Sequence, residues 1–282
     1  MTQEPKPKTA QANGPLWGAR SHDWANIQEG TVRPVYRTVL ERTGVGPSTN
    51  YLDVGCGAGM AVSMAAELGA MISGIDASDP LLEIARTRTK NADFRNGDLE
   101  ELPYGDATFD VVTGFNSFQY AGNPALALGQ ARRVTKPGGT VVIVTWGTPE
   151  GMEAASLVAV LKPFLPPPPP GAPGPFALSD ESTLREFASS AGLTPTAVFD
   201  VDDPWTYPDL DTAVRGMCSA GVAVKAMEHS GEEAVTSAYA AAFAPFLQSD
   251  GTVRVGASFR CLIAQPSRAD ADGPQRHSPS RS

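Results

Sequence analysis

The sequence predicts an α/β fold. Between residues 51 and 146, short apolar and β-branched segments alternate with segments that repeat their apolar residues at helical spacing. The first short segment, YLDVGCGAG (51–59), is a strand that runs into a glycine loop, where backbone can approach a ligand closely. We therefore expect a Rossmann-like, seven-stranded, mostly parallel sheet with an antiparallel last strand, an N-terminal helical lid and a C-terminal helical insertion.

The elements of the central region follow in order. A helix that begins at Met60 ends at Gly69, and a second helix has Asp79 as its N-cap and Pro80 at its first position. A third helix is expected from the sequence PALALGQARRV. The strands between and after these helices are expected at 70–76, 92–98, 109–115 and 140–146.

Beyond residue 146 the pattern changes. The run PFLPPPPPGAPGPF (163–176) predicts extended, polyproline-like chain. A helix should follow, with Ser179, Asp180 or Ser182 as its N-cap and Gly192 at its end. Two final strands are expected at 194–207 and 252–265, separated by an alanine-rich helical stretch at 211–247.

These elements divide the chain into five parts. The central part, 49–148, is the ligand-binding core, and 15–48 is the helical lid in front of it. Residues 149–266 supply a substrate cap and the last strands of the same sheet. The two ends, 1–14 and 267–282, are rich in Pro, Ser and charged residues without periodicity, and we expect them to be disordered.

Composition limits the partners. The 282 residues carry 22 Lys and Arg against 31 Asp and Glu, a net charge of -9, without a basic cluster, so a nucleic-acid partner is not expected. No apolar run is long enough for membrane insertion or a signal peptide. The three cysteines, Cys56, Cys218 and Cys261, have neither disulfide nor metal-site spacing. We expect a cytoplasmic protein without a bound metal.

The glycine loop allows several ligands. A dinucleotide site requires G-x-G-x-x-G, but Met60 stands in the place of the third glycine, and the Gly-Lys-Ser/Thr ending of a phosphate-binding P-loop does not occur here. Asp76 ends the next strand, where a carboxylate can accept hydrogen bonds from a ribose diol. Asp98 ends the third strand beside the same crevice and could accept from an adenine amino group. A ligand with a nucleoside part is therefore expected.

The segments LDVGCGAG, GIDAS, GDLEELPYGDATFDVV and VTKPGG together resemble the successive motifs of class I S-adenosylmethionine-dependent methyltransferases, in particular the small-molecule branch similar to quinone-biosynthesis methyltransferases. The resemblance is strong from Tyr51 to Trp146 and weaker in the flanks. It implies S-adenosyl-L-methionine as cofactor. The cofactor-binding residues that it implies are Asp53, Gly55, Cys56, Gly57 and Gly59 near the methionine part, Asp76 and Ala77 at the ribose, Asp98 and Leu99 at the adenine, and Phe115 and Asn116 closing over the cofactor.

The expected reaction is transfer of a methyl group to a small organic acceptor, a secondary metabolite or quinone-like compound, at oxygen, nitrogen or carbon. In-line methyl transfer needs chiefly alignment, water exclusion and a destination for a proton. His22, His229 and Tyr120 are candidates for that last role, although a surface or structural role is the commoner one for such residues.

Two other functions stay open at this point. A cyclase or isomerase could bind the same cofactor without transferring its methyl group, because binding and transfer need the same contacts. An NAD-dependent oxidoreductase is disfavoured by Met60. The identity of the acceptor and the oligomeric state, a homodimer being one option, are not predicted.

Overall fold

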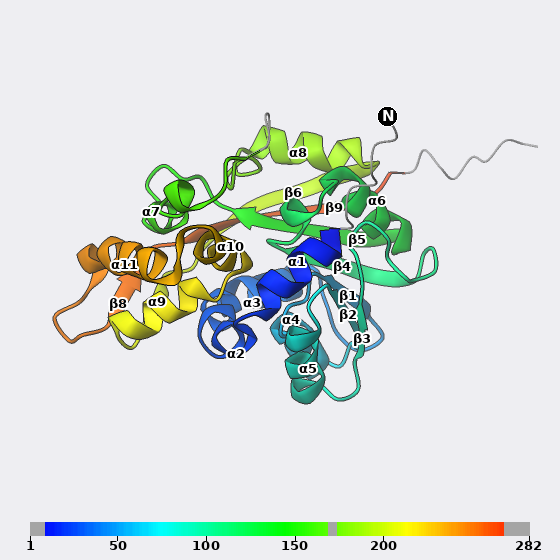
Figure 1. Cartoon of the computed structure of the whole chain (residues 1–282). Coiled ribbons are helices and arrows are strands. Elements are labelled where there is room, and N and C mark those ends of the chain that lie inside the picture. The colour runs from blue at the N-terminus through cyan, green and yellow to red at the C-terminus, as the bar shows by residue number, and fades with distance from the viewer. Residues whose placement is uncertain (1–8, 169–173, 268–282) are drawn as a thin grey trace, which may run out of the picture.

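The computed structural model describes residues 9–168 and 174–267 (Figure 1). Its centre is a seven-stranded sheet in the order β3-β2-β1-β4-β5-β9-β6. All neighbouring pairs are parallel except those of β9, which runs antiparallel to both β5 and β6. The predicted fold class is confirmed. The strands are β1 (Asn50–Val54), β2 (Met71–Asp76), β3 (Asp93–Asn96), β4 (Phe109–Phe115), β5 (Thr135–Trp146), β6 (Leu193–Asp202) and β9 (Ser258–Pro266).

Helices cover both faces of this sheet. One face packs on α3 (Arg33–Arg42), α4 (Met60–Glu67) and α5 (Asp79–Arg88), whose buried side chains include Leu40, Val62 and Leu82. The other face packs on α6 (Pro124–Val134) and α8 (Glu181–Ser190) through side chains such as Leu128 and Leu184. Because helices cover both faces, the side chains on both sides of a central strand are buried. This explains why β1 and β5 are nearly continuous apolar runs.

Helix boundaries agree with the local signals, with one correction. Asp180 is the N-cap of α8, and Gly69 and Gly192 follow helices in the left-handed conformation, at φ of 87° and 75°. However, α5 is capped by Ser78 and not by Asp79: the Ser78 hydroxyl accepts from the Leu81 amide at 3.3 Å. Asp79 lies in the first turn, where a carboxylate still interacts favourably with the helix dipole.

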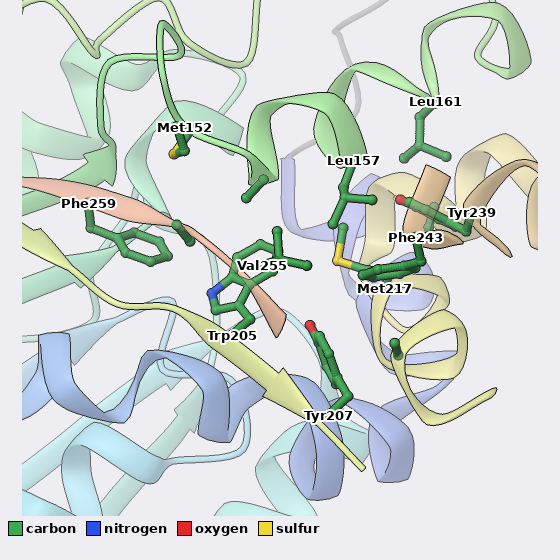
Figure 2. Packing of buried hydrophobic residues seen from close by; sticks show 14 of the residues in the cluster. Met152, Leu157, Leu161, Trp205, Tyr207, Met217, Tyr239, Phe243, Val255 and Phe259 are labelled. Atoms are coloured by element: carbon green, nitrogen blue, oxygen red, sulfur yellow. The ribbon is translucent and has the colours of Figure 1, made fainter. Parts of the chain in front are cut away.

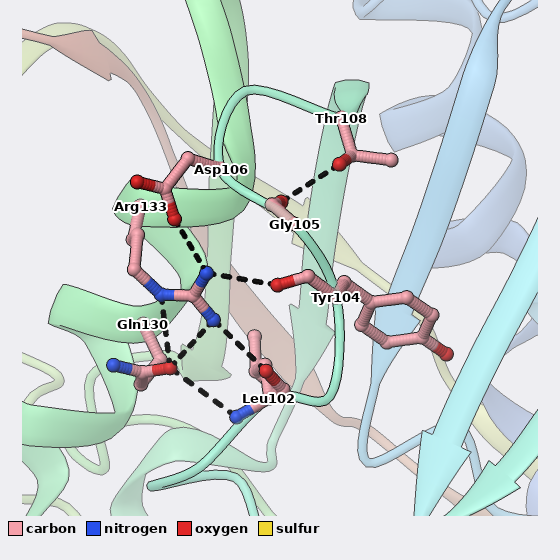
Figure 3. A network of polar contacts seen from close by, with 7 residues as sticks. All are labelled: Leu102, Tyr104, Gly105, Asp106, Thr108, Gln130 and Arg133. Carbon is pink, nitrogen blue, oxygen red and sulfur yellow. Dashed lines mark hydrogen bonds and ion pairs between the residues drawn. The ribbon is translucent and has the colours of Figure 1, made fainter.

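An arginine of α6 fixes the loop between β3 and β4. Figure 3 shows the Arg133 guanidinium donating to the carbonyl oxygens of Leu102 and Tyr104, at 2.9 and 2.8 Å, and pairing with Asp106 at 2.7 Å. Gln130, one turn earlier, accepts from the same guanidinium. Because this loop follows directly from the end of β3, the network helps to hold the adjoining carboxyl edge of the sheet in place.

The C-terminal insertion builds a cap at one end of the sheet (Figure 1). The expected strand 194–207 is interrupted after Asp202, and its second part, β7 (Trp205–Tyr207), pairs with β8 (Val253–Val255) in a separate two-stranded sheet. Pro204, which lacks an amide hydrogen, stands at the interruption. The remaining cap elements are α7 (Ala154–Ala159), η4 (Lys162–Phe164), α9 (Leu210–Cys218), α10 (Gly221–Ser230), α11 (Glu232–Phe243) and η5 (Ala244–Phe246).

The cap has its own apolar core. Figure 2 shows Trp205 and Tyr207 of β7 among side chains of α7, α9 and α11, including Leu157, Met217 and Phe243. The aromatic rings of Tyr207 and Phe243 meet edge to face, with centroids 5.8 Å apart. This cluster continues onto β5 and β9, so the cap and the sheet share one core.

The N-terminal region differs from the expectation at residues 9–14. These residues belong to helix α1 (Thr9–Gly18), not to a disordered tail. Their weak apolar periodicity hid the helix, which is held by tertiary contacts: the Thr9 hydroxyl donates to Glu100 and the Asn13 amide to the Tyr120 carbonyl. Between α1 and α3 lie three short elements, α2 (Ser21–Asp23), the π-helical turn η1 (Trp24–Gln28) and η2 (Glu29–Val32).

Other expectations fall partly outside the described residues. The expected tail 267–282 lies outside them except for Ser267, as do residues 169–173 of the proline-rich run; residues 166–168 have no regular structure. The three cysteines are buried and form no disulfide. Within the two described ranges, no helix has the length and apolar character that crossing a bilayer requires.

The shared core predicts a large effect of one cap residue. Replacing the fully buried Phe243 by alanine should lower the free energy of unfolding by about 3–5 kcal/mol, because a cavity would open beside Tyr207 and Tyr239. Urea unfolding followed by circular dichroism measures this change. Leu247→Ala, at a side chain that is 47% exposed, is the control and should change it by about 0.5 kcal/mol or less. Equal effects of the two variants would contradict the packing described here.

Candidate functional site

The glycine loop lies at the carboxyl edge of the sheet, between β1 and α4. The amides of Gly55 and Cys56 both donate to the Ile75 carbonyl, at 2.8 and 3.0 Å, which ties the loop to the end of β2. Gly55, Gly57 and Gly59 all have positive φ. A side chain at Gly59 would stand 2.8 Å from the Ala85 methyl group, so only glycine allows α4 to begin this close to α5.

Asp76 holds the same loop from the neighbouring strand. Its two carboxylate oxygens accept from the amides of Gly57 and Ser78, both at 2.9 Å. These hydrogen bonds favour the charged form, yet the pKa of Asp76 is raised above its ordinary value because burial outweighs them. The carboxylate therefore sits at the predicted place, beside the glycines, in surroundings that would favour a nearby positive charge.

Asp53, on β1, is a second buried carboxylate of the loop. Its Oδ1 accepts from the Thr113 hydroxyl of β4 at 2.8 Å, and Thr113 also exchanges a hydrogen bond with the Tyr51 hydroxyl. The pKa of Asp53 is raised to about 7: burial is the largest cause, the Thr113 hydrogen bond opposes it, and the carboxylates of Glu29 and Asp76 add to it.

Glu29 brings a third carboxylate to the loop from η2 of the lid. Only 2% of this residue is exposed; its Oε1 accepts from the Met60 amide at 3.2 Å and its Oε2 pairs with Arg88 at 2.6 Å. Arg88, the last residue of α5, also donates to the Ala58 carbonyl at 2.8 Å and to the Ala25 carbonyl. Burial raises the pKa of Glu29 more than this partner lowers it. A buried ion pair thus joins the lid to the glycine loop.

A tryptophan of the lid faces the loop from the same side. A side chain at Gly57 would meet the Trp24 Nε1 at 3.3 Å and the Glu29 Oε1 at 3.7 Å. The Trp24 Nε1 is buried and has no hydrogen-bond partner among the described residues. An unpaired buried donor is uncommon in folded proteins, and a bound molecule is one way of satisfying it. Gly57 is thus bordered by a donor and a carboxylate.

Helix α1 covers the edge beside Asp98. The Ala10 amide donates to Asp98 Oδ2 at 2.9 Å, and the Glu100 amide donates to Oδ1 at the same distance. A hollow of about 420 Å³ lies alongside, lined by Ala10, Gln11, Asn96, Gly97, Asp98, Glu101, Leu102 and Pro103. Further along α1, the Ala77 carbonyl is so close to Gly14 that a side chain there would clash with it.

The end of β4 closes the crevice on its other side. The Asn116 backbone has a φ of 49°, a strained conformation that is concentrated at functional sites, and its side chain accepts from Gln119 at 2.9 Å. Phe115 meets the ring of Tyr36 from α3 edge to face, with centroids 4.6 Å apart. The predicted residues of β1, β2 and β4 and of the loop after β3 therefore lie along one edge of the sheet. The third strand ends at Asn96 and not, as was expected, at Asp98. Leu99 follows Asp98 there, half-buried.

This geometry can be compared with known proteins. Residues 52–143 match the model of a methyltransferase domain. The chain is 33% identical to demethylmenaquinone methyltransferase of Renibacterium salmoninarum over 123 residues, which are 44% of this chain and 52% of that protein. It is 34% identical over 155 residues to 27-O-demethylrifamycin SV methyltransferase of Amycolatopsis mediterranei, covering 49% and 57%.

Residues 52–143 are a class I methyltransferase domain. The chain spans about half the length of the curated relatives that it matches. Among solved structures, the [4+2]-cyclase SpnF has a TM-score of 0.57 at 22% identity and covers 93% of this chain and 98% of its own. At that identity the likeness shows the fold alone.

The methyltransferase domain does not bring the three predicted proton acceptors together. His22 and His229 are both exposed, on α2 and α10. Tyr120 packs edge to face on Trp17 of α1, and burial raises its pKa to about 12, so its hydroxyl stays protonated near neutral pH. Within the described ranges, no three His, Cys, Asp or Glu residues are grouped in a way that could hold a metal ion.

A larger hollow lies at the opposite edge of the sheet. Its volume is about 920 Å³, and its lining includes Asn50, Met71 and Asp93, the first residues of β1, β2 and β3. Ligands of open α/β sheets bind outside the carboxyl ends of the strands. We therefore place the site of the methyltransferase domain at the glycine loop and not in the larger hollow.

Sequence reasoning pointed to Trp24 as one of several aromatic residues that could border the pocket, but it missed Glu29 and α1. Glu29 forms no recognisable motif with the glycine loop, since Glu29 and Met60 are 31 positions apart. A single glutamate in the lid is more often a solvated charge.

The buried ion pair predicts a test of the lid. Arg88→Met should lower the free energy of unfolding by about 3–5 kcal/mol, because it leaves the Glu29 carboxylate buried without a partner. It should also speed amide hydrogen exchange in 24–32. Arg95→Met is the control: Arg95 pairs with Asp93 at the surface and should contribute about 1 kcal/mol or less. Unchanged exchange in the lid would refute the coupling.

Asp53 predicts a pH dependence of stability. Its pKa is about 7 in the folded chain and about 4 when unfolded, so its contribution is fully present below about pH 4 and is lost as the pH rises through 7. Asp53→Asn keeps an acceptor for Thr113 but does not titrate. Wild type should therefore lose stability relative to this variant over that range in chemical unfolding. Parallel curves would show that Asp53 is not buried as described.

Proposed function

We propose that this chain is an S-adenosylmethionine-dependent methyltransferase that acts on a small organic molecule. The observation that carries the proposal is electrostatic. Three carboxylates, those of the buried Glu29 and Asp53 and of the half-buried Asp76, lie around the glycine loop, and burial raises the pKa of each above its ordinary value. Such a crevice favours a ligand with positive charge and repels a pyrophosphate. The sulfonium cofactor fits this requirement and NAD does not.

The residues around the loop fit the parts of that cofactor. We assign Asp76 to the ribose hydroxyls because it lies beside the glycines, and Asp98 to the adenine amine because it lines the 420 Å³ hollow. Near Gly57, the Glu29 carboxylate can pair with the ammonium of the methionine portion, and the unpaired Trp24 Nε1 can donate to its carboxylate.

When bound, the cofactor supplies an electrophilic methyl group on positively charged sulfur. The chain must align it and exclude water from it. The lid does both, because Trp24 and Glu29 cover the glycine loop and the Glu29–Arg88 pair holds them there. The aromatic pair of Tyr36 and Phe115 borders the end of β4, where an apolar acceptor can approach. The relatives named above are methyltransferases of demethylmenaquinone and of 27-O-demethylrifamycin SV, which supports an acceptor of this general kind.

Isothermal titration tests the cofactor. S-adenosylmethionine and S-adenosylhomocysteine should both bind in the micromolar range, and NADH should not bind. Asp76→Ala should weaken the binding of both sulfur compounds by about 10- to 100-fold, because hydrogen bonds to a charged group are each worth about 1.5–3 kcal/mol.

Asp79→Ala is the matched control for this substitution. Asp79 is exposed in the first turn of α5, three residues along the chain, and its removal should leave the affinity close to that of wild type. Tight binding of NADH would contradict the proposal. Equal affinities of the Asp76→Ala and Asp79→Ala variants for the sulfur compounds would contradict it as well. Cyclisation of a substrate at full rate with S-adenosylhomocysteine in place of the methyl donor would favour a cyclase instead.

A further inference from the structure

Asp203 stands between the sheet and the cap. It follows the last residue of β6 and precedes β7, and its amide donates to the Ala257 carbonyl at 2.8 Å. From here, buried and exposed side chains alternate along the chain. Asp203, Trp205 and Tyr207 are 3%, 1% and 1% exposed. The residues before each of them, Asp202, Pro204 and Thr206, are exposed. Three side chains with polar atoms therefore point inward from one short segment.

Two of these polar side chains lack a hydrogen-bond partner. The Tyr207 hydroxyl donates to the side chain of Gln28 at 2.9 Å. The Asp203 Oδ2 and the Trp205 Nε1, by contrast, are buried and make no hydrogen bond to any described residue. A buried carboxylate without a partner is costly, and folded proteins rarely keep one that has no use. The unpaired acceptor and the unpaired donor are two residues apart on the same side of the chain.

This pair lies close to the cofactor crevice. Tyr36 contacts Phe115 at the end of β4. Burial raises the pKa of Tyr36 most, the carboxylates of Glu29, Asp53 and, least, Asp203 raise it further, and Arg88 lowers it. The Tyr36 hydroxyl is therefore within electrostatic reach of the glycine-loop carboxylates and of Asp203. Trp205 contacts Trp146 at the end of β5, with centroids 5.8 Å apart. In Figure 2 the indole nitrogen of Trp205 points away from Met217 and Phe243.

We propose that Asp203 binds the methyl acceptor and removes its proton, and that this acceptor is an aromatic compound carrying a hydroxyl group. The inference rests on the function proposed above. A hydroxyl donates one hydrogen bond and accepts others, so it can satisfy both the Asp203 carboxylate and the Trp205 indole; an ammonium only donates. The rings of Tyr36, Phe115, Trp146 and Trp205 suit an aromatic body.

The proposed step balances. The acceptor oxygen forms a bond to the methyl carbon while the carbon–sulfur bond breaks, and the electron pair of that bond stays on sulfur, which becomes a neutral thioether. The hydroxyl proton passes to the Asp203 carboxylate and is later released to water. Burial raises the pKa of Asp203 to about 7, which suits a group that must accept and release a proton near neutral pH.

The test compares two fluorescent probes, 2-naphthol and its methyl ether 2-methoxynaphthalene, in the presence of saturating S-adenosylhomocysteine at neutral pH. The full chain should bind 2-naphthol about tenfold more tightly than the ether, because only the phenol donates a hydrogen bond to a charged acceptor. Asp203→Ala should bind both probes equally. A merely structural role would weaken both probes alike and leave their ratio unchanged.

Two further variants make the result decisive. Asp202→Ala removes the neighbouring exposed carboxylate and should keep the tenfold preference. Asp203→Asn preserves the shape of the side chain if the alanine variant fails to fold, and it should reduce the preference, since a neutral acceptor makes a weaker hydrogen bond. No preference in wild type, no binding of either probe, or a preference retained without the Asp203 carboxylate would each overturn the inference. If S-adenosylhomocysteine itself does not bind, the proposed function fails first.

Discussion

The ion pair between Glu29 and Arg88 is the interaction on which the site depends. It joins the lid, the start of α4 and the end of α5, because Glu29 accepts from the Met60 amide while Arg88 donates to the carbonyl oxygens of Ala58 and Ala25. Buried pairs of this kind add little net stability, since desolvation offsets their attraction. Their value here is positional: a misplaced lid would leave a buried charge unpaired, so one arrangement is favoured over its neighbours.

The central sheet and its cofactor edge could be predicted from sequence, because local patterns determine them. A strand followed by Gly55, Gly57 and Gly59 has few alternatives, as positive φ at successive glycines and close packing on Ala85 admit little else. Asp76 ends β2, and Asp98 lies two residues beyond the end of β3; the carboxyl ends of these parallel strands share one edge of the sheet. Spacing along the chain was therefore enough to bring these residues together.

The rest depends on contacts between distant parts of the chain. Helix α1 has little apolar periodicity and is fixed by partners such as Asp98 and Tyr120, about a hundred positions away. The sequence does not distinguish the neighbouring residues Asp202 and Asp203. Only the alternating side-chain directions of the extended chain between β6 and β7 expose Asp202 and bury Asp203. His22 and His229 were candidates because imidazole can accept a proton near neutral pH, yet both residues lie at the surface.

Helix α1 contacts both the cofactor edge and the cap. Its first turn donates to Asp98, and its far end places Trp17 against Gly221 of α10, so closely that a side chain on that glycine would clash with the indole. One helix thus connects the glycine-loop edge with the cap. Any ligand that moves α1 at one end changes the free energy of binding at the other. By thermodynamic linkage this influence is mutual, so two ligands bound at the two ends of α1 would change each other's affinity by the same factor.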